Sequence, residues 1–262
     1  MNENSLKTLL SSVANGATSI DAAMEQLRHM PFESLTDDDA TTFAHIDHHR
    51  ALRCGHPETI FCSGKTTPQI VDIFSRLAAT GHNVLATRAT QEHFDAVHAQ
   101  FPAANYESLA RCITLRQIEN RKIENSPYIA LVAAGTADLP VAEEARVTVE
   151  LLDQPIKTLY DVGVAGLHRL LLQRDVLTHA SVVIAVAGME GALPSVVAGL
   201  VDCPVIAVPT SVGYGVHLHG LAPLLAMLNA CTPNLAVVNI DNGFSAATLA
   251  ALINKQAKPK SL

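Results

Sequence analysis

Two residues in the last third of the chain stand out for the chemistry that they can do. Cys231 is a nucleophile when its thiol ionises, and Glu190 lies in a glycine-rich loop where a carboxylate can act as a general acid or base. Each also has a purely structural interpretation. Cys231 can be a small buried residue at the end of an apolar helix, and Glu190 can be an acid that interacts with the positive end of a helix.

Glycine-punctuated segments surround these residues, at 187–194, 208–215 and 239–244. Each follows a short apolar run, where a strand would pass into a loop. Small residues and free backbone amides at such a point let a ligand approach the main chain closely, which is how α/β folds hold nucleotides. Three such segments in one domain predict a nucleotide-like substrate.

Three aspartates follow predicted strands in the same way, Asp138, Asp161 and Asp241. A carboxylate at this position can bond a ribose or hold a metal ion. It can equally cap the helix that follows, because aspartate is favoured immediately before a helix. The sequence leaves both interpretations open.

Phosphate and metal sites are less clearly indicated. Residues 63–66, Ser-Gly-Lys-Thr, resemble the end of a phosphate-binding loop, but Thr59 stands where the upstream glycine is needed, so no Walker site is predicted. Arg53, Lys65 and Arg88 can contribute cations to a phosphate, and the alternative is solvated surface charge. Of these, we expect Arg53 and Lys65 to contact the phosphate or adenosine end of a nucleotide. The histidine clusters have no cysteine or carboxylate at zinc-site spacing, so metal binding is not favoured at His45, His48 and His49 or at His217 and His219.

The elements that must position these residues are predicted from hydrophobic periodicity. Apolar runs at 128–134, 156–160, 181–186, 204–208 and 235–240 alternate with helical patterns at 141–152, 164–171, 193–200 and 221–228 and with a last helix from about residue 244. Nearly all-apolar strands in β-α units require a parallel sheet that is covered on both faces. We therefore predict an α/β protein with a doubly wound, five-stranded parallel sheet of flavodoxin-like layering.

The first part of the chain predicts a smaller α/β domain with a helical preface. Helices are expected at 6–13 and 20–27, then strands at 58–62 and 83–86 with helices near 70–77 and 91–100. The polar stretch 117–126 is the predicted linker. The domains would then be residues 1–125 and 126–262.

Composition limits the class of protein. The 262-residue chain has a net charge of −7 and no basic run, which argues against nucleic-acid binding. Its five cysteines are odd in number and contain no CxxC pair, so a reducing cytoplasm without disulfides is expected. No segment is apolar for long enough to span a bilayer, so we expect a soluble protein without membrane partners.

Cys231 poses a geometrical problem within this predicted fold. Ligands bind outside the carboxyl ends of parallel strands, whereas Cys231 follows a helix and precedes the fifth strand. This position is at the opposite edge of the sheet. Either Cys231 is structural, or the pocket of another subunit receives it.

The motifs together resemble the pyridinium-3,5-biscarboxylic acid mononucleotide synthases, which begin the biosynthesis of the nickel-pincer nucleotide cofactor. The resemblance rests on AAGTADLPVAEEA, DVGVAGLHR, AGMEGALPSVVAGL, CPVIAVPTSVGYG, LAPLLAMLNAC and VVNIDNGF, and more thinly on DHHRALRCGHPETIF. The C-terminal domain is in turn similar to the carboxyaminoimidazole ribonucleotide mutases. The chain departs from the family pattern at His217-Leu218-His219, which replaces a more neutral loop, and at Asn234 and Ser245, where glycine is expected.

This resemblance implies carboxylation of the pyridinium ring of nicotinic acid adenine dinucleotide, with hydrolysis of its diphosphate to release AMP. The Cys231 thiolate would add to ring carbon 4, and Glu190 would remove the proton from ring carbon 5 after the new carboxyl group has formed there. The sequence leaves open whether CO2 or bicarbonate is the direct reactant. We expect no tightly bound cofactor, a magnesium ion at the substrate diphosphate, and a homo-oligomer, an octamer, with sites between subunits. Besides Arg53 and Lys65, the expected substrate contacts are Gly135, Thr136, Asp138, Asp161, Gly163, His168, Gly188, Met189, Gly191, Ser211, Gly213, Tyr214, Asp241 and Asn242.

Two other functions stay open at this point. An aminoimidazole ribonucleotide carboxylase or mutase would share the fold, but its ring is already an enamine and needs no nucleophile such as Cys231. A non-catalytic nucleotide-binding module would use the same loops without chemistry.

Overall fold

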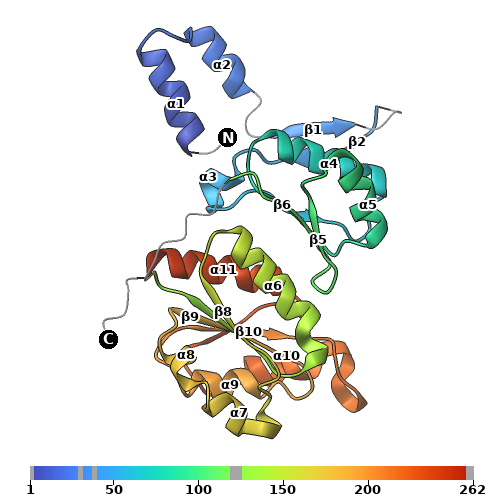
Figure 1. Cartoon of the computed structure of the whole chain (residues 1–262), viewed down its shortest axis with the longest axis vertical. Coiled ribbons are helices and arrows are strands. Elements are labelled where there is room, and N and C mark those ends of the chain that lie inside the picture. Colours follow the sequence, from blue (N-terminus) through green and yellow to red (C-terminus); the bar gives the residue numbers. More distant parts are fainter. Residues whose placement is uncertain (1–2, 29–31, 37–39, 119–125, 258–262) are drawn as a thin grey trace. The chain divides into compact units, whose positions relative to one another are not determined.

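The computed structural model describes residues 3–28, 32–36, 40–118 and 126–257 (Figure 1). By its internal contacts the chain divides into two units, residues 1–106 with 113–119 and residues 107–112 with 120–262. Residues 119–125, which hold most of the predicted linker, lie outside the described residues. The predicted domain boundary after residue 125 therefore stays a prediction.

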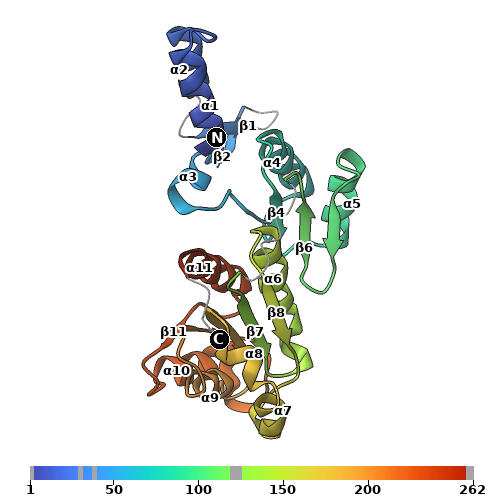
Figure 2. The same ribbon diagram turned by 60° about the vertical axis from the view of Figure 1, so that its left-hand side comes forward.

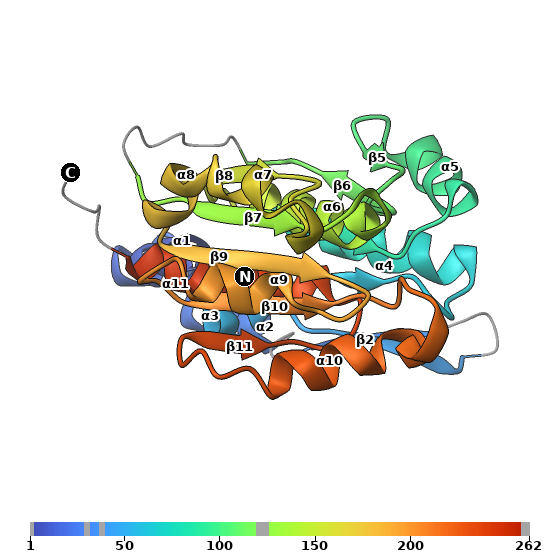
Figure 3. The same cartoon turned by 90° about the horizontal axis from the view of Figure 1, so that it is seen from below.

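A five-stranded parallel sheet forms the centre of the C-terminal unit, as the apolar runs predict. Its strand order is β8-β7-β9-β10-β11, which is the doubly wound flavodoxin-like order (Figure 3). The strands are β7 (Ile129–Ala133), β8 (Ile156–Leu159), β9 (Val182–Ala187), β10 (Val205–Pro209) and β11 (Leu235–Val237). The predicted α/β fold class is confirmed.

Helices cover both faces of this sheet, because successive residues of each central strand point to opposite sides. In β7, Ala130 and Val132 pack into one apolar cluster, whereas Ile129 and Leu131 pack into the other. One face carries α6 (Leu139–Leu151) and α11 (Gly243–Gln256) (Figure 1). The other carries the short helices η2 (Val164–Gly166), α7 (Leu167–Leu171), α8 (Arg174–Thr178), α9 (Leu193–Ala198) and α10 (Leu221–Leu228).

Two C-terminal elements differ from the sequence prediction. The single helix expected at 164–171 is divided into η2 and α7, and a further short helix, α8, follows. Gly166 adopts a non-helical conformation with φ of −122° and ψ of 55°, which separates η2 from α7. The fifth strand ends at Val237 rather than at Ile240, although the Val238 amide still donates to the Ala207 carbonyl of β10.

The N-terminal half begins with an antiparallel pair of helices, α1 (Glu3–Ala14) and α2 (Ile20–Arg28), as predicted (Figure 2). A hairpin follows, β1 (Glu33–Thr36) and β2 (Thr42–Ile46), and then the short helix α3 (Arg50–Cys54). The four-stranded sheet has the order β3-β4-β6-β5. Its elements and flanking helices are β3 (Ile60–Phe61), α4 (Thr67–Ala79), β4 (Val84–Thr87), α5 (Gln91–Gln100), β5 (Asn105–Glu107) and β6 (Cys112–Leu115).

The loop that resembles part of a phosphate-binding loop has a structural role. The Thr66 hydroxyl accepts from the Gln69 amide, and the Gln69 side chain accepts from the Thr66 amide, so the two residues form a capping box at the start of α4. The ammonium of Lys65 donates to the Phe61 carbonyl at 2.8 Å. Lys65 and Thr66 thus bond within the chain, at Phe61 and at the start of α4.

Asn234, one of the departures from the family pattern, forms hydrogen bonds with the segment that precedes β10. The side-chain nitrogen of Asn234 lies 3.1–3.3 Å from the carbonyl oxygens of Ala198, Val201 and Cys203. Its main-chain carbonyl accepts from the Val205 amide at 2.8 Å. A glycine at this position would leave those three carbonyls without this donor.

Asn234→Ala should therefore lower the free energy of unfolding by about 1–2 kcal/mol, because partly buried carbonyls lose their donor. Asn234→Asp is the isosteric control, and it should be at least as destabilising at neutral pH because a carboxylate would face carbonyl oxygens. Urea unfolding followed by circular dichroism measures both. An alanine variant within about 0.3 kcal/mol of the parent protein would contradict this role.

Candidate functional site

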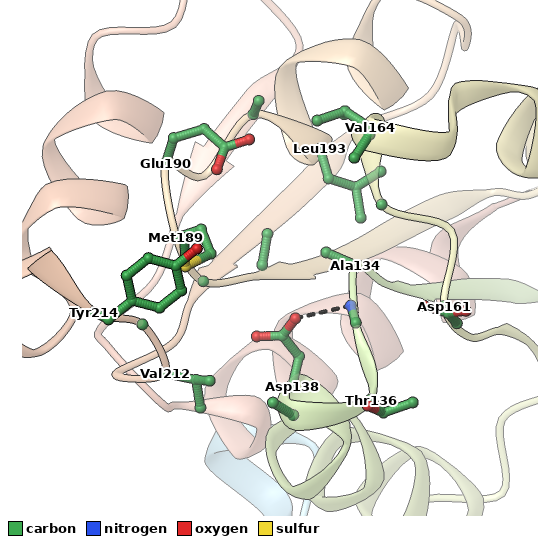
Figure 4. A pocket seen from close by; sticks show the side chains of 18 of the residues that line it. Ala134, Thr136, Asp138, Asp161, Val164, Met189, Glu190, Leu193, Val212 and Tyr214 are labelled. Atoms are coloured by element: carbon green, nitrogen blue, oxygen red, sulfur yellow. Dashed lines mark hydrogen bonds between the residues drawn. The ribbon is translucent and has the colours of Figure 1, made fainter.

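A cavity of about 590 Å³ lies at the carboxyl ends of β7, β8, β9 and β10 (Figure 4). This edge of the sheet is where doubly wound folds bind ligands, and the volume is in the range of small-molecule sites. The lining residues that the sequence predicted are Gly135, Thr136, Asp138, Asp161, Gly163, Gly188, Met189, Glu190, Gly213 and Tyr214. The strand-end loops are thus brought together in one pocket.

The remaining predicted site residues do not line this cavity. His168 is in α7, and Gly191 follows Glu190 in the β9 loop, where its α-carbon faces Pro223. Asn242 caps α11, its side-chain oxygen accepting from the Ser245 amide at 2.8 Å. The others outside the lining are Ser211, Asp241, Cys231, Arg53 and Lys65.

Asp138 joins two of the loops that form the pocket. One carboxylate oxygen accepts from the Gly135 amide at 2.9 Å, and the other accepts from the Thr210 hydroxyl at 2.7 Å. The hydrogen bond to the Gly135 amide is the dashed line in Figure 4, and Asp138 is only 5% exposed. Asp138 therefore holds the loop after β7 against the loop after β10, and it does not cap α6 through its side chain.

Burial raises the pKa of Asp138 above its ordinary value of 3.8. Hydrogen bonds from Thr210, Gly135 and Gly188 oppose this by lowering the pKa, and the charge of Asp241 raises it. The net direction is upward, so the folded protein binds a proton at Asp138 more tightly than the unfolded chain does.

Asp241 and Ser211, which were expected to contact substrate, contact each other. The Ser211 amide donates to the Asp241 carboxylate at 2.7 Å, and the Asp241 amide donates to the Pro209 carbonyl at 2.8 Å. Asp241 has a positive φ of 57°, a conformation that aspartate tolerates better than most residues. The segment after β11 is thereby fixed to the end of β10.

Glycine is required at position 188 because the neighbouring loops touch its α-carbon. A β-carbon there would lie 2.2 Å from the Val212 carbonyl oxygen and 2.6 Å from the Thr210 hydroxyl. The next amide, that of Met189, donates to the same Val212 carbonyl at 3.2 Å. The loops after β9 and β10 therefore meet through main-chain atoms.

Arg169 lines the cavity opposite these glycine loops and was not among the predicted site residues. Its guanidinium donates to the Asp161 carboxylate at 2.5 Å, and its Nε is buried without a hydrogen-bond partner among the described residues. The sequence contains one usable signal, since Arg169 lies in the segment that follows the predicted strand at 156–160. The guanidinium of an arginine that lines such a pocket suits an anionic ligand group.

The two residues that are best suited to catalysis, Glu190 and Cys231, do not line the same cavity within one chain. Glu190 lines the cavity and is exposed, and no hydrogen bond to its carboxylate occurs among the described residues (Figure 4). Cys231 is an exposed free thiol between α10 and β11, on the approach to the amino end of that strand. Within one chain, Cys231 therefore lies at the edge of the sheet opposite to the cavity, as the sequence predicted.

Arg53 and Lys65 have partners within their own unit. Arg53 forms a two-point ion pair with Asp47, with nitrogen–oxygen distances of 3.1 and 2.6 Å, and Lys65 bonds Phe61 as described above. Their predicted contact with a nucleotide stays a prediction. Across the described ranges, no group of three or more histidine, cysteine or acidic side chains is arranged to hold a metal ion.

No helix within the described ranges is both long and apolar enough to cross a membrane.

The raised pKa of Asp138 predicts how stability depends on pH. Protonated Asp138 favours folding at low pH, and this contribution is lost as the pH rises through its folded-state pKa. Asp138→Asn stays neutral, so the unfolding free energy of the variant minus that of the parent protein should increase as the pH rises above 3.8, the ordinary pKa of aspartate. Urea unfolding of both proteins at several pH values measures this difference. A constant difference, or a shift toward the parent, would contradict the assignment.

Comparison with known protein families matches both parts of the chain. Residues 38–117 match the LarB/PurE-like N-terminal domain, and residues 128–261 match AIR carboxylase. The second match contains all five strands of the parallel sheet and every residue that lines the cavity.

Relatives of known sequence agree with these matches. The chain is 37% identical over 257 residues to an uncharacterized protein of Methanocaldococcus jannaschii, which covers 95% of this chain and 97% of that protein. It is 38% identical over 127 residues to the N5-carboxyaminoimidazole ribonucleotide mutase of the same organism, covering 47% of this chain and 75% of that enzyme. The mutase of Pyrococcus horikoshii is 31% identical over 134 residues, with 48% and 72% covered. The chain therefore belongs to the AIR carboxylase family, in a form that carries a LarB/PurE-like N-terminal domain.

Proposed function

We propose that this protein carboxylates the pyridinium ring of nicotinic acid adenine dinucleotide at ring carbon 5 and hydrolyses the phosphoanhydride. The products would be AMP and pyridinium-3,5-biscarboxylic acid mononucleotide. The observation that carries the proposal is an open pocket with the carboxylate of Glu190 in its wall, together with a free exposed thiol at Cys231. Carboxylation is the chemistry for which the family is named, and the thiol is what a pyridinium substrate requires in addition.

A pyridinium ring is electron-poor and does not attack CO2. When the Cys231 thiolate adds to ring carbon 4, its electron pair forms the C–S bond and the ring nitrogen becomes neutral. Ring carbon 5 is then the nucleophilic end of an enamine, and its electron pair forms a bond to CO2 while positive charge returns to the nitrogen. Removal of the proton from carbon 5 regenerates the enamine, which expels the thiolate and restores the aromatic ring.

Glu190 is the base in this scheme because it is exposed at the pocket and is not engaged in a hydrogen bond with the described residues. The glycine loops would receive the ring and ribose against backbone amides. Arg169, which lines the cavity, would bind an anionic group of the substrate through its guanidinium. Magnesium would enter with the substrate diphosphate, and we assign no protein ligand to it.

The thiol must come from a second copy of the chain. On α10, Leu221, Leu225 and Leu228 are 41%, 55% and 62% exposed and recur at helical spacing, so one apolar face of the helix is uncovered. Cys231 follows Leu228, the last of these leucines, by three residues. We therefore propose a homo-oligomer in which α10 packs against another subunit and delivers Cys231 to that subunit's pocket.

The covalent step predicts a substrate-dependent adduct on one cysteine. After incubation with nicotinic acid adenine dinucleotide and acid quenching, intact-protein mass spectrometry should show an added mass that is absent from Cys231→Ala. Cys54→Ala is the matched control, because Cys54 is the other exposed cysteine, and it should keep both the adduct and the carboxylation activity.

The same variants separate the alternatives. Loss of pyridinium carboxylation in Cys231→Ala supports the proposal. Aminoimidazole ribonucleotide turnover that survives Cys231→Ala would indicate a mutase instead. Nucleotide affinity without turnover in any variant would indicate a binding module.

Sharing of the site between subunits predicts complementation. Cys231→Ala and Glu190→Gln should each be inactive, and co-refolded or co-expressed mixtures should regain activity at about one quarter of the sites, because only those pair an intact cysteine with an intact glutamate. Size-exclusion chromatography with differently tagged chains confirms mixing. Mixed oligomers without activity would contradict a shared site.

A further inference from the structure

His217 is a buried residue of the segment Gly215–Gly220, directly beyond the pocket wall. Its side chain is buried, with only 5% of the residue exposed, and its Nδ1 accepts a hydrogen bond from the Gly220 amide at 3.2 Å. A neutral imidazole that accepts at Nδ1 carries its proton on Nε2. The Nε2–H group is therefore a donor whose direction is fixed by the loop.

This donor has no acceptor within the described part of the chain, although the atom is buried. A buried donor without an acceptor is energetically costly, so its persistence calls for an explanation. The imidazole ring lies on the α-carbon of Gly213, where a β-carbon would be 2.4 Å from Cδ2 and 2.8 Å from Nε2. Gly213 is itself part of the pocket lining, so only the thickness of one backbone segment separates Nε2 from the cavity wall.

The backbone that carries His217 is held by little packing and contains strain. Leu218 and His219 both have left-handed conformations, with φ of 51° and 52°, which side chains of this kind rarely adopt. Val216 and Leu218 are apolar but 87% and 65% exposed. A small rearrangement of residues 213–220 would therefore relieve strain and lose little burial.

We propose that His217 is a specificity-determining residue of the pocket, whose Nε2–H donates to an anionic oxygen of the bound ligand when the segment 213–220 shifts. The ligand then supplies the acceptor that the described residues do not. The ligand oxygen is either a ring carboxylate or a phosphate, which present the same chemistry to an imidazole N–H. This proposal rests on the proposed function only in treating the pocket as the nucleotide site.

Two substitutions distinguish the role of Nδ1 from the role of Nε2 in His217. Asparagine can keep an acceptor for the Gly220 amide but lacks a donor at the Nε2 position, whereas glutamine can keep a donor near that position. His219→Asn is the matched control, because asparagine tolerates the left-handed backbone there. Thermal unfolding of each variant establishes that the fold is intact.

Calorimetric titration with nicotinic acid adenine dinucleotide, in the presence of magnesium, measures the effect. His217→Asn should weaken binding about tenfold or more, equivalent to about 1.4 kcal/mol, while His217→Gln and His219→Asn stay within about threefold of the parent protein. Titration with nicotinamide adenine dinucleotide, which has an amide in place of the ring carboxylate, distinguishes the two acceptors. A tenfold loss with both ligands indicates a phosphate, and a loss only with the acid indicates the ring carboxylate.

Three results would overturn the proposal. Unchanged affinity in His217→Asn would remove any role for Nε2, equal losses in the asparagine and glutamine variants would reduce His217 to a packing residue, and a loss only in His217→Gln would assign its role to the Gly220 contact. If the parent protein binds aminoimidazole ribonucleotide instead of the dinucleotide, the proposed function fails, and the same variants test His217 with that ligand.

Discussion

The pocket depends on direct contact between the main chains of neighbouring strand-end loops. Gly188 approaches the Val212 carbonyl so closely that no side chain fits between them, and Asp138 links the Gly135 amide to the Thr210 hydroxyl across the same junction. A buried carboxylate is costly to desolvate, and here it is retained with both oxygens hydrogen-bonded. The result is a rigid frame at the edge of the sheet, formed largely by backbone.

The groups that would do chemistry differ from the groups that form the frame. Asp138 and Thr210 are buried and bonded to each other, whereas Glu190 and Cys231 are exposed. A base and a nucleophile that must meet substrate have to be accessible, while loop contacts have to be shielded from water to be strong. The exposed leucines of α10 are consistent with the proposed homo-oligomer, because a surface that packs against a second subunit is apolar and is uncovered in a single chain.

Much of this arrangement follows from local sequence patterns. Unbroken apolar runs such as Ile129–Ala133 have few alternatives to a buried parallel strand, and glycines at their ends place the pocket at the carboxyl edge. The strands β1, β2 and β5 could not be predicted in this way because most of their side chains are at least partly exposed and no apolar run marks them. The division of the helix at 164–171 depends on the conformation of Gly166, which hydrophobic periodicity does not report.

Within the site, sequence patterns predicted the loops but not the hydrogen bonds that join one loop to another. Ser211 and Asp241, both predicted to contact substrate, are also joined to each other, and a hydrogen bond between residues 30 positions apart leaves no local signature. Arg169 was missed because a cation on a short helix resembles ordinary surface charge until its Nε is seen to be buried.

A frame of this kind bears on evolutionary divergence. Because the pocket's shape is maintained by main-chain contacts and a few buried polar groups, lining residues such as Val164, Ala165 and Val212 can be exchanged without rebuilding the scaffold. A single ancestral architecture can then accept different ligands through a handful of substitutions, while the edge of the sheet that binds them stays the same.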